Sequence, residues 1–164
     1  MSCTLYSKDV SSYQEWRVSL IEPEILLILA LTMFGEAGIM SNDAALGVGH
    51  VLHNRAIEAG GYEQAARGFY GYDPHAQAPA HYYDLARQVL ERAEDPTQGS
   101  VYVFSHQDLH SLFGDDAPCI RQLAPWQSEL QQIKGIPYRL YSYQDWPGEQ
   151  DLHPAGLCDE RWEH

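Results

Sequence analysis

The most apolar stretch of the chain covers residues 25–34, and Thr32 is its only polar member. Pro23 lies just before it, where a proline favours the first turn of a helix. The apolar side chains fall on every face of that helix, which is typical of a helix enclosed by other elements. The stretch is about half the ~20 residues that a membrane span needs. We therefore predict a helix buried in the core of a folded domain.

A carboxyl group follows this apolar run directly. Glu36 lies between Gly35 and Gly38, at or just past the predicted end of the helix. Apolar surroundings and the negative end of the helix dipole both disfavour a carboxylate anion, so we expect a raised pKa for Glu36. A general acid in glycoside cleavage needs such a pKa near neutral pH. The alternative is a glutamate that only caps a turn.

Local signals in the rest of the chain predict an α+β fold, mostly helical with a small antiparallel sheet of two or three strands. The predicted elements are a second helix from the N-cap residues 41–43 to Gly60 and Gly61, an irregular loop over 62–80, a third helix over 79–93, a turn at 95–99, and strands at 100–105 and 137–143. Within the second helix, Gly47 and Gly49 would let a neighbouring helix come close.

Charge and composition narrow the range of partners. The chain has 164 residues, which suits one domain, and carries 10 Lys+Arg against 23 Asp+Glu, a formal net charge of -13 at pH 7. Nucleic acid and anionic lipid would repel such a surface, so we expect neither a nucleic acid nor a membrane as a partner. An anionic polymer would have to be held by short-range contacts in a cleft.

Cysteine and histidine spacing predicts no metal site and no cofactor. The three cysteines have no Cys-x-x-Cys spacing, and they allow at most one disulfide, with Cys119–Cys158 as one candidate pair. His50 and His53 are three residues apart on the second helix, but no Glu stands between them in the metalloprotease position. We interpret these histidines as polar-face or partly buried residues.

Four blocks of sequence follow one another over residues 28–142. The blocks are residues 29–55, which include Phe34-Gly35-Glu36-Ala37 and Asn54-Arg55, then Gly68-Phe69-Tyr70, then Asp95-Pro96-Thr97-Gln98-Gly99-Ser100-Val101-Tyr102, and finally Ile133-Lys134-Gly135-Ile136-Pro137-Tyr138. In this order they resemble the SleB-type cell wall hydrolase family, and the first block keeps the family spacing. The resemblance has departures, because the Arg and second Glu of the family pattern are Gly38 and Met40 here, and a later acidic position is Asp43.

The resemblance implies a lysozyme-like fold with the sheet beside a cleft, and a peptidoglycan-cleaving glycosidase that acts on the MurNAc–GlcNAc bond as a lytic transglycosylase. It implies that Glu36, within Phe34-Gly35-Glu36-Ala37, is the catalytic acid/base. One carboxylate can suffice for that chemistry. The muramic acid C6 hydroxyl closes on C1, and a glutamate can protonate the leaving oxygen and then accept the hydroxyl proton. The candidate substrate-binding residues are Asp43, Phe69, Tyr70, Tyr102, Phe104 and Ser105, and core packing is the alternative for the aromatic ones.

Domain boundaries and location follow from the same interpretation. We predict an N-terminal extension over residues 1–22, a catalytic domain over 23–143 and an acidic C-terminal tail over 144–164. The first 16 residues lack a basic segment followed by an apolar core, so we expect no secretory signal. Such an enzyme would be made in the cytoplasm and would reach the cell wall after lysis or through a specialised secretion device.

The expected partners are peptidoglycan glycan strands and an inhibitor or delivery protein. Two other functions remain open. One is a non-catalytic relative that binds glycan or a partner protein, which the missing second Glu and the negative charge favour. The other is a metal-dependent amidase that uses the histidines. We expect Asn54 and Arg55 to be structural, and Asp95 to form an Asx-type turn.

Overall fold

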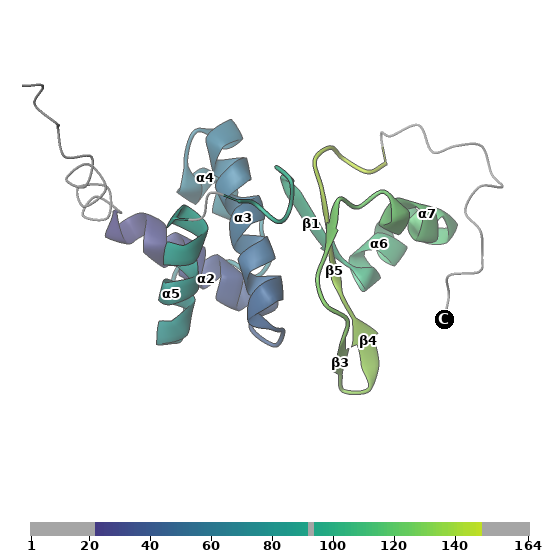
Figure 1. Ribbon diagram of the computed structural model, residues 1–164, viewed down its shortest axis with the longest axis horizontal. Helices are drawn as coiled ribbons and strands as arrows, with labels where there is room; N and C mark the ends of the chain where they lie inside the picture. Colours follow the sequence, from purple (N-terminus) through teal and green to yellow (C-terminus); the bar gives the residue numbers. More distant parts are fainter. Residues whose placement is uncertain (1–21, 92–93, 149–164) are drawn as a thin grey trace, which may run out of the picture.

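A computed structural model describes residues 22–91 and 94–148. Its elements make an α+β fold with a helical half and a sheet half, which lie next to each other in Figure 1. The helical half consists of α2 (Pro23–Ala37), α3 (Asn42–Ala59), α4 (Tyr62–Ala66) and α5 (Ala80–Glu91). The sheet half consists of β1 (Tyr102–Ser105), α6 (His106–Phe113), η1 (Gly114–Asp116), α7 (Ala117–Gln122), β2 (Trp126–Gln127), β3 (Gln131–Ile133), β4 (Ile136–Tyr138) and β5 (Leu140–Tyr143).

The predicted core helix is present as α2. It packs against α3 and α5, and its central residues Leu29, Ala30 and Met33 have no exposed surface. The Thr32 hydroxyl donates to the Ile28 carbonyl at 2.8 Å, so the one polar side chain of the apolar run is satisfied inside the core. Among the described residues, no helix combines the length and apolar character needed to cross a membrane.

The predicted ends of the second helix are confirmed in α3. The Ser41 side chain accepts from the Ala44 N–H at 3.3 Å, and Gly60 ends the helix in the left-handed conformation with a φ of 78°. Gly49 faces side chains of α2 and α5, as a close helix neighbour requires. Gly47 instead faces the Trp126 ring of β2, because a β-carbon there would lie 2.2 Å from the ring.

Two predicted boundaries in the helical half are wrong. The expected loop over 62–80 contains the short helix α4, whose Ala65 and Ala66 are buried against the core. Five residues are too few for an apolar periodicity to show, so packing rather than pattern determines this turn. The third helix begins at Ala80, one residue after Pro79, and is described to Glu91. Residues 92–93 of that prediction lie outside the described residues.

The sheet is antiparallel as predicted, in the order β1-β5-β2. The predicted strand over 137–143 is two strands, because β4 pairs with β3 in a separate hairpin while β5 pairs with β1 and β2. Lys134 and Gly135 connect β3 to β4 with φ values of 53° and 79°, the backbone of a two-residue hairpin turn. The stretch between the predicted strands also contains α6 and α7, two helices that were not predicted from the sequence.

Polar contacts attach the sheet half to α3. The Asn54 amide donates to an Asp95 carboxylate oxygen at 2.7 Å and to the Ser100 carbonyl at 3.1 Å. Asp95 in turn accepts from the Thr97 N–H at 2.8 Å, which is the expected Asx-type turn. At the other end of α3, the Gln131 side chain accepts from the Ser41 N–H at 2.8 Å. The sheet half is therefore held at both ends of one helix, and the predicted structural role of Asn54 is confirmed.

Candidate active site

Glu36 is the penultimate residue of α2, and its carboxyl group is half-buried. The Gly71 N–H donates to Glu36 Oε1 at 2.7 Å. This contact depends on two glycines, because a β-carbon on Gly35 would lie 1.7 Å from the Gly71 carbonyl oxygen. The loop after α4 therefore passes directly over the end of α2 and fixes one oxygen of the carboxyl group.

The pKa of Glu36 is raised from its ordinary value, in the expected direction. Burial of the carboxyl group is the main cause, and the negative charge of Asp108 adds to it. The hydrogen bond from Gly71 acts the other way, because it stabilises the carboxylate. Protonated Glu36 is therefore present at a higher pH than it would be for an exposed glutamate.

Asp108 is a functional candidate that was not predicted from the sequence. It lies in the first turn of α6, where its Oδ2 accepts from the Ser105 N–H at 2.9 Å and from the Ser105 hydroxyl at 2.7 Å. The Asp108 N–H donates back to the Ser105 hydroxyl at 3.1 Å, which completes a capping box. The Ser-x-x-Asp spacing is a recognised sign of a helix start, so the local structure could have been found. The effect of the Asp108 charge on Glu36 could not have been found in this way, because the two residues are far apart in the sequence.

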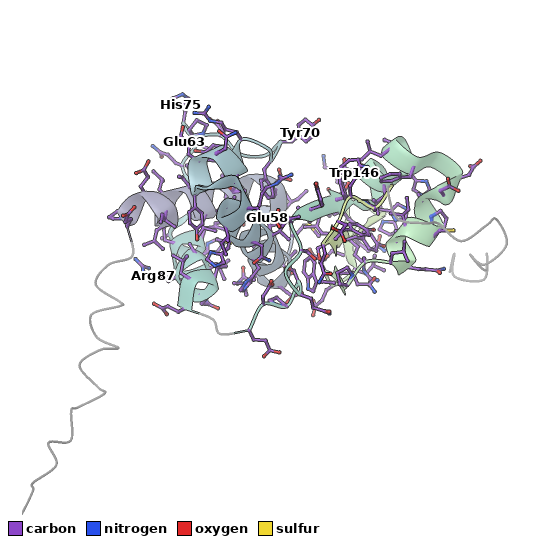
Figure 2. The ribbon with its side chains drawn as sticks, turned by 90° about the horizontal axis from the view of Figure 1, so that it is seen from above. Glu58, Glu63, Tyr70, His75, Arg87 and Trp146 are labelled. Atoms are coloured by element: carbon purple, nitrogen blue, oxygen red, sulfur yellow. The ribbon has the colours of Figure 1, made fainter. Side chains whose placement is uncertain are left out.

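Three of the predicted substrate-binding residues differ in their exposure to solvent and in their contacts. Ser105 is buried, and its hydroxyl is used in the capping box of α6. Asp43 is exposed in the first turn of α3, and it is not among the charges that shift the pKa of Glu36. Tyr70 next to Gly71 is fully exposed, and Figure 2 shows it projecting from the helical half toward the side that carries Trp146.

The other predicted aromatic residues are brought together around Arg55. The Arg55 guanidinium lies 5.1 Å from the centre of the Phe69 ring and 5.6 Å from that of Tyr102, so it joins the two halves of the molecule. Phe69 is only 7% exposed and belongs to the core of the helical half. Phe104 is stacked parallel to Tyr102. It packs against a second cluster of buried apolar residues, which lies in the sheet half. Phe69 and Phe104 are thus packing residues in this structure.

The histidines that raised the metal alternative have structural surroundings. His50 is buried, with its Nδ1 3.6 Å from an Asp95 carboxylate oxygen. His53 Nδ1 contacts the Tyr62 hydroxyl. Burial lowers the pKa of His53 and raises that of Tyr62 to about 12. Within residues 22–91 and 94–148, no three or more His, Cys, Asp or Glu side chains are grouped so that they could hold a metal ion.

Cys119 is disulfide-bonded. The pairing with Cys158 considered from the sequence lies outside the described residues.

Comparisons of this chain with protein-family models, with curated proteins and with solved structures find no match.

Proposed function

We propose that this protein is a lysozyme-like glycosidase that cleaves the MurNAc–GlcNAc bond of peptidoglycan as a lytic transglycosylase, with Glu36 as its acid/base. The observation that carries the proposal is the half-buried Glu36 carboxyl group with a raised pKa, held at one oxygen by the Gly71 N–H. The four sequence blocks that resemble the SleB-type hydrolases support the substrate class. The sheet half adds the negative charge of Asp108, in the first turn of α6, which acts on Glu36.

The hydrogen bond from Gly71 determines where the acidic proton lies. Glu36 Oε1 accepts from the Gly71 N–H, so the proton of the acid form is carried by Oε2. Oε2–H donates to the glycosidic oxygen as the C1–O bond breaks. The resulting carboxylate then accepts the proton of the muramic acid C6 hydroxyl. As that proton leaves, the hydroxyl oxygen bonds to C1 of the same sugar, which closes a 1,6-anhydro ring. Glu36 returns to its acid form, so one carboxyl group serves both steps.

Asp108 assists this chemistry in two ways. Its negative charge raises the pKa of Glu36 and so keeps the acid protonated. The same charge stabilises the positive charge that develops at C1 in the transition state. The capping box holds the Asp108 carboxylate in place before substrate binds, which avoids the cost of reorienting it.

Hydrolysis is the second candidate outcome, and Asp108 is the observation that favours it. A hydrolytic route needs a second carboxylate, as nucleophile or as base for water. Two other acidic candidates for that role are Asp43 and Asp73. Neither is among the groups that shift the pKa of Glu36, whereas Asp108 is. If water rather than the C6 hydroxyl attacks C1, Asp108 is the carboxylate that assists it.

Product analysis tests the proposed function directly. Digestion of purified sacculi is expected to release muropeptides with 1,6-anhydro muramic acid ends, identified by mass spectrometry as one water lighter than reducing ends. Cleavage should persist after exhaustive chelation, because no step uses a metal ion. Products with reducing ends alone would show that hydrolysis is the route. Activity lost with chelator and restored by zinc would contradict the mechanism and favour an amidase.

Replacing Asp108 by Asn is expected to shift the pH profile of cleavage. The Asp108 anion raises the pKa of Glu36, so removing that charge lowers the pKa. The rate falls as pH rises through the Glu36 pKa, and this fall should therefore move to lower pH in Asp108→Asn. Asn can still accept from Ser105, which preserves the start of α6. Asp84→Asn, an exposed change on α5, is the matched control. An unchanged alkaline limb in Asp108→Asn would rule out this role for Asp108.

A further inference from the structure

A cavity of about 440 Å³ lies between the helical half and the sheet half. Glu58, in the last turn of α3, lines it from the helical half, and Tyr102, Asp145 and Trp146 line it from the sheet half. In Figure 2 Glu58 and Trp146 lie on the facing sides of the two halves, whereas Glu63 and Arg87 lie on the far side of the helical half. The proposed cleavage mechanism does not use this cavity.

The aromatic wall of the cavity is held rigidly. The Trp146 ring meets Tyr102 and Phe104 edge to face, with ring centres 5.5 Å apart in both cases and interplanar angles of 80° and 82°. Phe113 of α6 also packs against the Trp146 ring, with ring centres 6.0 Å apart. The orientation of Trp146 is therefore set by packing before any ligand arrives. The Tyr102 ring already attracts a cation of the protein itself, the Arg55 guanidinium.

The two carboxylates of the cavity have no cationic side chain paired with them in the described ranges. The ion pairs found there join His50 to Asp95, Glu63 to Arg67 and Asp84 to Arg87, and none includes Glu58 or Asp145. Arg55 does not serve this purpose, because its guanidinium lies over the Phe69 and Tyr102 rings. Two carboxylates beside two aromatic rings, in a cavity of this size, match the requirements of a positively charged group.

We propose that this cavity binds the side-chain ammonium group of the diamino acid in peptidoglycan stem peptides, an inference that rests on the proposed function. An alkylammonium group carries three N–H donors, which can reach both carboxylates, and its methylene groups can lie on the Trp146 ring. The formal net charge of -13 attracts such a group to the protein. Because the amine is charged only where it is not cross-linked, the cavity selects glycan strands with uncross-linked stems.

Peptide binding measured without turnover tests this inference. The probe is the peptide N-acetyl-L-Ala-γ-D-Glu-L-Lys amide, whose lysine carries its one amine, titrated by calorimetry into full-length Glu36→Gln protein, which separates binding from cleavage. Acetylation of the lysine side-chain amine is expected to weaken binding at least about tenfold, since it removes the charge. The double change of Glu58→Gln and Asp145→Asn should weaken binding of the unmodified peptide by about the same factor. Both residues are exposed, so folding should be unaffected.

The control is Glu63→Gln, which removes one exposed carboxylate from the far side of the helical half and should leave peptide binding unchanged. Equal affinity for the acetylated and the unmodified peptide would overturn the inference, as would normal binding by the double variant. Displacement of the peptide by the neutral sugar chitotetraose would show that the cavity is a glycan subsite instead. None of these results depends on whether the wild-type protein cleaves peptidoglycan, so failure of the cavity proposal and failure of the glycosidase proposal are separately visible.

Discussion

Replacing Glu36 by Gln is expected to abolish peptidoglycan cleavage while the protein still folds. The amide oxygen of Gln can accept from the Gly71 N–H as Glu36 Oε1 does, so the local structure is preserved. The amide cannot donate and then accept the catalytic proton, and loss of general acid–base catalysis costs about 10²–10⁴-fold in rate. Turbidity loss of purified sacculi measures the rate, and circular dichroism on heating measures the fold.

Glu63→Gln serves as the control for this substitution, because Glu63 is exposed and pairs with Arg67 of the same half of the molecule. Its cleavage rate should match that of the wild type. A purified, folded Glu36→Gln protein with near-normal turnover would refute the assignment of Glu36. If the wild type itself binds sacculi without cleaving them, the protein is instead the non-catalytic relative considered from the sequence.

Replacing Gly35 by Ala is expected to lower both stability and activity. The added β-carbon would lie 1.7 Å from the Gly71 carbonyl oxygen and 2.4 Å from its carbon, and both are backbone atoms that cannot rotate away. The loop must therefore move, and overpacking of this kind costs about 1–3 kcal/mol of unfolding free energy. Movement of the loop also withdraws the Gly71 N–H from Glu36, so the cleavage rate should fall in the fraction that remains folded. Urea unfolding followed by circular dichroism gives the free energy.

Gly61→Ala is the matched control for the Gly35 substitution. A β-carbon on Gly61 would have no atom within 4 Å, and its backbone is extended. Its free energy of unfolding should stay within about 0.5 kcal/mol of the wild type, as for most surface substitutions. A Gly35→Ala protein with wild-type stability and rate would mean that the contact between α2 and the loop does not hold the site together.

Local patterns in the sequence predicted the parts of the fold that depend on nearby residues. The buried character of α2 follows from its own apolar side chains, and both ends of α3 follow from Ser41 and Gly60. The Asp95 turn likewise depends on contacts within a few residues. The raised pKa of Glu36 was also predictable, because burial at the end of an apolar helix is its main cause.

Short elements escaped prediction because their stability comes from packing. The helix α4 is too short to show a period, and its buried alanines matter only against the neighbouring helices. The segment 137–143 has one strand-like composition, yet its two ends pair with different strands. Its first residues belong to β4, which pairs with β3, and its last residues form β5, which pairs with β1 and β2. Which strand a residue pairs with depends on distant parts of the chain.

The sequence by itself determined the catalytic candidate and the helix that carries it, because the apolar run and the adjacent glycines act locally on Glu36. Only the tertiary structure decided what surrounds that carboxyl group. The Gly71 N–H is brought to it by the loop after α4, and the Asp108 charge by the start of α6. Residues so far apart in the chain are brought together by burial of the core and by the contacts of α3 with the sheet half. No local pattern records those contacts.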